Sequence, residues 1–208
     1  MSGLCIFPQD NTTLFLKPIA DKLQELGYDV CDDSTNNEEY VKTILKNIPN
    51  YDNIVFLGHG SSEALLGSNL TSMINADNVD LLRGKKLFLL SCNSKEFISS
   101  YSLADAIGFD IIPTGETDLL SILNMDYYYF EDIPDDKDME YFREAIARII
   151  KNSFDGSDMA NMTMLYNRVK MYTNRERYEC IRKAKNLHYR DVLKMLYDFK
   201  DNMVCVRG

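Results

Sequence analysis

Two short segments of the sequence end in residues that can perform acid–base or nucleophilic chemistry. Residues 54–57 form an apolar run that leads into His59, and residues 87–90 form a second run that leads into Cys92. Runs of this length and composition are typical of buried β-strands. Because catalytic groups gather at the carboxyl ends of parallel strands, we expect His59 and Cys92 to face one crevice. A thiol beside an imidazole is the minimum equipment for cysteine nucleophilic catalysis.

The elements that must position these residues alternate along the chain. Short apolar runs predict strands at residues 4–7, 28–31, 54–57, 87–90 and 109–112. Helical spacing of apolar residues predicts helices at residues 11–26, 38–48, 78–82 and 97–107. Asp77 is suited to be the N-cap of the third helix, and Gly108 the C-cap of the fourth. This alternation predicts an α/β sandwich with a mainly parallel sheet.

The composition changes near residue 131, where an acidic connector that contains proline begins. We therefore expect an α/β domain at residues 1–130 and a helical C-terminal extension at residues 131–208. The helices of the extension are predicted at residues 139–152, 159–172 and 175–200. Residues 1–140 carry a net charge of −15, whereas residues 141–208 carry +6. The basic extension could dock on the acidic body, form a solvated face or bind an anionic partner.

Composition and cysteine usage restrict the class of protein. The acidic body disfavours nucleic-acid binding, and no apolar run reaches the roughly 18 residues that a membrane span needs. The N-terminal stretch lacks the pattern of a signal peptide, so we expect a cytoplasmic protein with no membrane partner. The five cysteines are widely spaced and include no C-x-x-C pair. They predict neither a disulfide framework nor a zinc site.

The order of these features resembles the caspase-like clan of cysteine peptidases, and CHAT domains most closely. The features that carry the resemblance are an apolar strand, Gly58-His59-Gly60, a spacer of about thirty residues, a second apolar strand and Ser91-Cys92. Residues 102–112 are also similar to the small-residue helix and strand that follow the cysteine in CHAT domains. The likeness covers residues 50–120 by motif and residues 1–50 by topology. The run Asn93-Ser94-Lys95 lacks the glycine that many of these proteins have shortly after the cysteine.

The resemblance implies a caspase-like three-layer sandwich and a cysteine endopeptidase that acts on protein substrates. It implies that Cys92 is the nucleophile and that His59 activates it or protonates the leaving amine. It further implies an oxyanion hole from the backbone N–H groups of Gly60 and Cys92. No metal or organic cofactor is expected. Small microbial proteases of this clan are often tied to defence or regulated cell death, so the resemblance suggests such a pathway.

Other interpretations of the sequence remain open. The chain could be a catalytically inactive caspase-like interaction module, or an α/β nucleotide-binding or signalling domain. For the latter, the loop at residues 10–13 could hold a phosphate, although it has no glycine-rich signature. Glu116 and Asp118 could recognise a basic substrate side chain or could be solvated loop acids. With an acidic body and only Lys95 as a cation close after Cys92, we predict a preference for Arg or Lys before the cut.

Overall fold

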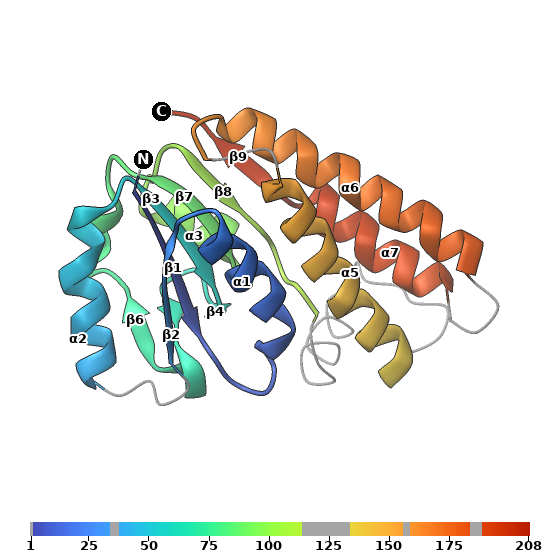
Figure 1. The fold of residues 1–208 in the computed structure, drawn as a ribbon, viewed down its shortest axis with the longest axis horizontal. Helices are drawn as coiled ribbons and strands as arrows, with labels where there is room; N and C mark the ends of the chain where they lie inside the picture. Colours follow the sequence, from blue (N-terminus) through green and yellow to red (C-terminus); the bar gives the residue numbers. More distant parts are fainter. Residues whose placement is uncertain (1, 34–37, 114–133, 156–158, 184–188) are drawn as a thin grey trace.

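The computed structural model describes residues 2–33, 38–113, 134–155, 159–183 and 189–208 (Figure 1). These residues form an α/β fold built around a mainly parallel sheet of six strands. The strand order is β2-β1-β3-β7-β8-β9, and only β9 runs antiparallel to its neighbour. The strands are β1 (Gly3–Pro8), β2 (Asp29–Asp33), β3 (Asn53–Leu57), β7 (Lys86–Leu90), β8 (Ala106–Gly108) and β9 (Val204–Val206).

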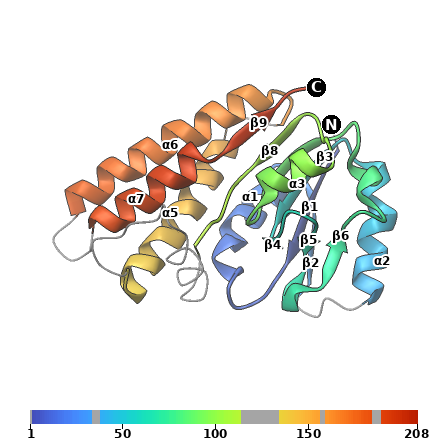
Figure 2. The same ribbon diagram turned by 180° about the vertical axis from the view of Figure 1, so that it is seen from behind.

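Helices cover both faces of the sheet because the central strands are apolar on both sides. On β1, Cys5 and Phe7 face one core, whereas Leu4 and Ile6 face the other. This pattern is typical of a parallel sheet buried between helices. The first core is covered by α1 (Lys17–Glu25), α5 (Asp136–Phe154), α6 (Met162–Lys183) and α7 (Tyr189–Asp201). The second core is covered by α2 (Glu38–Asn47) and α3 (Ser94–Ser100), which lie behind the sheet when α1 is in front (Figures 1 and 2).

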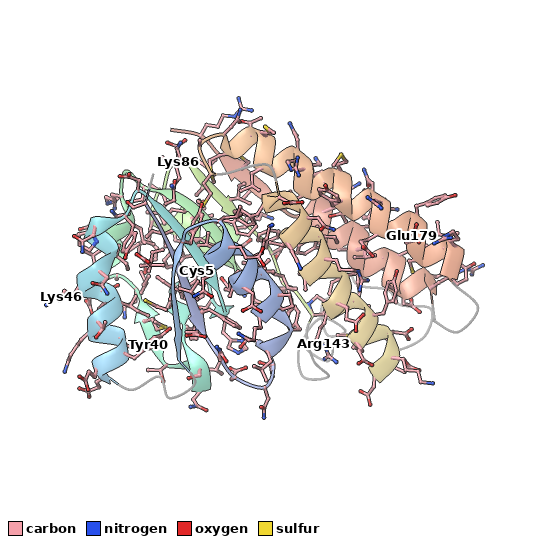
Figure 3. The ribbon with its side chains drawn as sticks, in the orientation of Figure 1. Cys5, Tyr40, Lys46, Lys86, Arg143 and Glu179 are labelled. Carbon is pink, nitrogen blue, oxygen red and sulfur yellow. The ribbon has the colours of Figure 1, made fainter. Side chains whose placement is uncertain are left out.

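Two hydrogen bonds from side chains to backbone carbonyl groups join the sheet to the segments beside it. Figure 3 places Cys5 within the sheet, where it is completely buried, and Tyr40 on α2. The hydroxyl of Tyr40 donates a hydrogen bond to the carbonyl oxygen of Cys31 at 2.9 Å, which fixes α2 against the edge strand β2. At the other side, the ammonium of Lys86 on β7 donates to the carbonyl oxygen of Ala160 at 2.9 Å. The sheet is therefore tied to segments on both flanks by side-chain-to-backbone bonds.

A small antiparallel sheet lies between β3 and β7 in the chain, where the sequence predicted a short helix at residues 78–82 and no strand. Its strands are β4 (His59–Gly60), β5 (Leu65–Leu66) and β6 (Ser72–Ile74), in that order across the sheet. Strands of two or three residues are too short to produce a readable alternation of apolar and polar positions. The importance of this sheet is that its first strand begins with His59.

The region after Cys92 differs from the prediction. Helix α3 ends at Ser100 rather than at residue 107, and Ala106–Gly108 is the fifth parallel strand. Residues 109–112, which were predicted to be that strand, continue beyond it without strand structure. Gly108 is not a helix cap. A Cβ at this position would lie 3.0 Å from the backbone N of Lys95 and 3.0 Å from the backbone C of Ser94, so the glycine allows close packing between β8 and the backbone of α3.

Two helix starts also differ from the prediction. The helix predicted at residues 11–26 begins with a turn and a 3₁₀ segment, Leu14–Leu16, before α1 starts at Lys17. Thr13 forms hydrogen bonds within this turn, which explains the late start. The short helix predicted at residues 78–82 is a 3₁₀ helix, Val79–Leu82, and its N-cap is Asn78 rather than Asp77.

The C-terminal helices are integrated with the sheet. Helix α6 runs without a break from Met162 to Lys183, so the predicted interruption near residue 173 is wrong. Buried residues of α5, α6 and α7 belong to the same core as α1 and the front face of the sheet. The chain then returns to the sheet as β9, a strand that the sequence did not predict. The predicted boundary between residues 130 and 131 lies outside the described residues.

Candidate functional site

The two chemically active residues singled out in the sequence lie at neighbouring strand ends. Strands β3 and β7 pair in parallel, with Leu57 opposite Leu90. The backbone N–H of Gly58 donates to the carbonyl oxygen of Leu90 at 3.2 Å, which extends the pairing to the point where the strands end. His59 follows directly, and Cys92 lies two residues beyond Leu90. Both residues line one narrow pocket of about 20 Å³, which is room for about one water molecule.

The imidazole of His59 is held by the loop that follows β1. Its Nε2 atom lies 2.7 Å from Oδ2 of Asp10 and 3.1 Å from Oγ1 of Thr12. The other carboxylate oxygen of Asp10 accepts hydrogen bonds from the backbone N–H groups of Thr12 and Thr13, which is the geometry of an Asx turn. Oγ1 of Thr12 also donates to this oxygen at 2.6 Å. One carboxylate oxygen therefore orders the loop while the second binds the histidine.

These partners assign the protonation of the ring. A carboxylate can only accept, so Nε2 of His59 carries a proton and donates it to Asp10. Thr12 uses its own proton on Asp10, so it too accepts from Nε2. In the neutral ring, Nδ1 is then the basic nitrogen.

The Asp10 carboxylate is stabilised in its charged form. Its partial burial raises its pKa, but hydrogen bonds from Thr12 and His59, together with the charge of protonated His59, outweigh burial and lower the pKa below its usual value. Asp10 therefore remains ionised throughout the neutral range. An ionised carboxylate bound to Nε2 holds the ring in one orientation.

Cys92 contacts the backbone that follows β8. Its Sγ atom accepts a hydrogen bond from the N–H of Ile112 at 3.4 Å and lies 3.5 Å from the carbonyl oxygen of the same residue. An N–H donor directed at sulfur favours the thiolate, whereas the carbonyl accepts from the neutral thiol. Loss of the thiol proton would break the contact with the carbonyl oxygen of Ile112 and strengthen the hydrogen bond from its N–H.

The four other cysteines are in environments that oppose ionisation. Burial raises the pKa values of Cys5, Cys31 and Cys205, and it raises that of Cys180 to about 11. A protonated thiol is a poor nucleophile. Cys92, by contrast, lines the pocket that also contains His59.

Gly60 is required by packing against the strand that leads to Cys92. A Cβ at position 60 would lie 2.7 Å from the carbonyl oxygen of Cys92 and 2.6 Å from Oγ of Ser91. The resemblance implied Gly60 only as a donor of a backbone N–H to the oxyanion. The structure gives a reason for the glycine, since the backbone of Cys92 itself fills the space. This contact fixes the distance between the His59 strand and the Cys92 backbone, and with it the spacing of the two predicted oxyanion donors.

The turn after Cys92 is shaped by two residues that sequence reasoning did not use. Asn93 adopts a left-handed conformation, with φ of 55°, and this conformation is better tolerated by asparagine than by most other residues. The absence of a glycine here is therefore compatible with a sharp turn. Oγ of the buried Ser94 donates to the carbonyl oxygen of Leu89 and accepts from the N–H of Phe109 at 2.8 Å. Ser94 thereby joins the end of β7 to the chain beyond β8.

Not every predicted site residue is placed. Glu116 and Asp118 lie outside the described residues. Asp10 and Thr12 were not predicted as partners of His59, although their loop had been singled out as a possible phosphate site. Within the described ranges, no group of three or more His, Cys, Asp or Glu residues could hold a metal ion. In the same part of the chain, no helix combines the length and the apolar character that are needed to cross a bilayer.

Comparison with known proteins gives no family assignment. A scan against protein-family models and a search of curated proteins both find no match to this chain. The functional argument therefore depends on the geometry of the pocket at the ends of β3 and β7.

Proposed function

We propose that this chain is a cysteine endopeptidase with a caspase-like fold, closest in kind to CHAT domains. The observation that carries the proposal is the shared pocket, in which Cys92 and a histidine oriented by Asp10 lie at the ends of adjacent parallel strands. A nucleophile, its base and a group that orients the base are the three parts of a covalent hydrolase site. The strand order and the helices on both faces of the sheet are compatible with the proposed fold.

The proposed reaction assigns a role to each residue. The thiol proton of Cys92 passes to Nδ1 of His59, and the thiolate attacks the carbonyl carbon of the scissile bond. Backbone N–H groups of Gly60 and Cys92 stabilise the oxyanion. The imidazolium then gives its proton to the leaving amine, and water hydrolyses the acyl-enzyme with His59 as the base. Asp10 holds the ring and offsets its positive charge throughout.

The charges of the described site favour a basic rather than an acidic residue before the cut. Apart from His59, the described lining of the pocket contains no cationic side chain. Lys95 faces Asp110 at 3.5 Å and Glu96 at 3.8 Å, so its charge is offset locally, and it lines a different groove. Recognition of an acidic side chain usually employs an arginine that is not already paired with another carboxylate. We therefore propose substrates with Arg or Lys before the cut, with Glu116 or Asp118 as the counter-charge.

Cleavage mapping tests the activity and the preference together. The full chain is incubated with a peptide library, and the new N-termini are identified. The proposal expects cleavage after basic residues that is lost in Cys92→Ala and in His59→Ala. Cys31→Ala is the matched control, because it removes a partly buried thiol that is remote from the pocket, and it should cleave as the parent does. Cleavage by Cys92→Ala at the parental rate would show that the nucleophile lies elsewhere.

Thiol labelling separates an active site from an inert one even if the library holds no good substrate. At neutral pH, iodoacetamide should modify Cys92 rapidly, and the rate should fall at least about tenfold in His59→Ala because the base is gone. Equal labelling rates in the parent and in His59→Ala would count against the dyad and favour the inactive interaction module.

A further inference from the structure

Helix α6 has apolar side chains on two opposite faces, which is unusual for a helix at the outside of a molecule. Its inner face packs on α5 and α7 and contributes Leu165, Val169 and Cys180 to the core, all completely buried. In both views of the ribbon, α6 lies along the outer margin of the molecule, away from α1 and α2 (Figures 1 and 2). The second apolar face is therefore not explained by packing within the described residues.

The outer face of α6 is defined by Met164, Met171, Tyr178 and Ile181, which are 43%, 52%, 67% and 54% exposed. Among the described residues, nine large apolar side chains are exposed, and these four all belong to this one face. At its N-terminal end, a hollow is lined by Met164 and Met171 together with neighbouring polar residues. Scattered exposed apolar residues need no explanation, but four of them on one face of one helix indicate a contact surface, even though Asn167 and Asn174 lie between them.

The spacing of the outer face fits a partner helix. Met164, Met171 and Tyr178 are seven residues apart, and Ile181 lies three residues after Tyr178. These are the a and d positions of a heptad repeat, and Asn167 and Asn174 occupy the two other d positions. A line of two positions in seven is the width that one docked helix covers. A helix that lies on a membrane has a broader apolar face, so the pattern favours a protein partner.

The residues beside the outer face are basic. In the same heptad, the e positions are Arg168, Arg175 and Arg182, and the g positions include Lys170 and Arg177. The two acidic residues of the helix are paired with arginines. Glu176 contacts Arg148 of α5 at 3.2 Å, and Glu179, on α6 in Figure 3, contacts Arg182 at 2.7 Å. The e and g positions select the partner of a helix by charge.

We propose that the outer face of α6 is a docking surface for an acidic amphipathic helix of a partner protein, apolar at its a and d positions and carrying Glu or Asp at e and g. Acidic residues there would meet the exposed Arg175, together with Arg168, which also donates to carbonyl oxygens at the end of α5, and Arg182, which also pairs with Glu179. A second copy of this chain fits poorly, because its α6 would bring arginine against arginine. The flexible side chains of Met164 and Met171 can adapt to the partner's apolar residues.

A designed peptide tests this proposal on the full chain. The probe is a fluorescent helix of about three heptads with Leu at a and d and Glu at e and g. Its twin has Lys at e and g. Anisotropy titrations should show binding of the Glu peptide, with the Lys peptide at least about tenfold weaker. Arg175→Glu, a change at an exposed position, should weaken the Glu peptide by a similar factor and improve the Lys peptide.

A matched pair of variants distinguishes binding at the outer face of α6 from non-specific hydrophobic binding. Met171→Asp places a charge in the middle of the outer face and should abolish binding. Leu70→Asp changes an equally exposed apolar residue away from α6 and should leave binding unchanged. Circular dichroism confirms that both variants are folded. Equal binding of the two peptides, or no binding of the Glu peptide, overturns the proposal. So does self-association that Met171→Asp removes, which would assign the face to a second copy, or binding to anionic vesicles without binding to the peptide.

Discussion

At the scale of single residues, the bond between Asp10 and His59 determines what the candidate site can do. It fixes the orientation of the ring and places the basic nitrogen on the side opposite the carboxylate. Without it, the imidazole could rotate, and a proton transferred from Cys92 would receive no electrostatic support. The loop that supplies Asp10 is itself ordered by the Asx turn with Thr12 and Thr13. Asp10, Thr12 and Thr13 thus form an ordered loop that holds the imidazole of His59.

Replacement of Asp10 by asparagine should leave the fold intact and reduce peptide cleavage. The amide has one acceptor oxygen, so it can bind either His59 or the N–H groups of Thr12 and Thr13 but not both, and it cannot offset the charge of the imidazolium. We expect kcat to fall by about a hundredfold, within the usual range for loss of acid–base assistance. Asp21→Asn is the control, since Asp21 pairs with Lys17 on the exposed side of α1. A kcat equal to that of the parent would remove Asp10 from the mechanism.

The same residue should make stability depend on pH in a defined direction. The pKa of Asp10 is lower in the folded protein than its ordinary value, so the ionised form stabilises the fold. This contribution is complete above the unfolded pKa of about 3.9, and it is lost as pH falls through the folded pKa. Urea unfolding should therefore show the parent more stable than Asp10→Asn at pH 6, with the difference shrinking below about pH 4. A difference that stays constant from pH 6 to pH 3 would contradict this account.

The placement of His59 and Cys92 at neighbouring strand ends could be predicted from sequence, but the contact of His59 with Asp10 could not. His59 and Cys92 follow apolar runs that can be recognised without a structure. Asp10 reaches His59 only because β1 pairs beside β3, so the contact depends on a sheet order that no local pattern shows. The Asx-turn residues around Asp10 were visible, but they predict a turn and not what the turn contacts.

At the scale of the elements, the junction of β7, α3 and β8 positions Cys92, the proposed nucleophile. Ser94, at the first position of α3, bonds to the ends of both strands. Gly108 allows α3 to lie against β8 without a clash. Cys92 lies in the turn between β7 and α3, so any shift of this junction moves the thiol.

Ser94→Ala should destabilise the fold measurably. The substitution leaves the buried N–H of Phe109 without its acceptor, and such a loss costs about 1–3 kcal/mol. Chemical denaturation followed by circular dichroism measures the change. Ser100→Ala, on the exposed side of the same helix, should change the free energy of unfolding by less than about 0.5 kcal/mol. Equal effects of the two substitutions would show that the Ser94 bonds do not contribute.

The same junction shows where sequence patterns stop being informative. Strands β1, β3 and β7 are five or six residues long and almost wholly buried, so their composition alone identifies them. Strand β8 has three residues, Ala106–Gly108, and follows a run that is equally compatible with a helix. Its pairing with β7 and its packing on α3 determine its conformation. The conformation of β9 likewise depends on pairing, because its strand partner β8 lies about a hundred residues earlier in the chain.

At the scale of the whole molecule, the C-terminal helices and the sheet share one core. Phe142 on α5 is completely buried in the cluster that also contains Phe7 of β1 and Ile19 of α1. An ion pair of 3.2 Å between Lys22 and Asp155 crosses the surface of the same contact. The helices beyond residue 134 therefore stabilise the strands that carry the site.

Phe142→Ala should reveal this coupling. Loss of a fully buried phenylalanine costs about 3–5 kcal/mol. We expect one cooperative unfolding transition, shifted to lower urea concentration, when circular dichroism and the exposure of the buried Cys5 thiol are followed together. Met164→Ala, which truncates an exposed side chain, is the control. Two separate transitions, with Cys5 protected after the helices have melted, would show that the sheet is stable by itself.

The last strand of the sheet has a consequence for biosynthesis. β9 pairs with β8, which leaves the ribosome about a hundred residues earlier, roughly 5–20 s at ordinary rates of translation. Until residues 204–206 emerge, the backbone N–H and C=O groups along the edge of β8 are unpaired, and strands of other nascent chains can bind to them. The strands that carry His59 and Cys92 are complete well before that time. We therefore expect the strands of the candidate site to be synthesised early, while the edge of β8 stays unpaired until β9 is made. Slower translation of the C-terminal helices would lengthen the interval in which chaperones must protect this edge from aggregation.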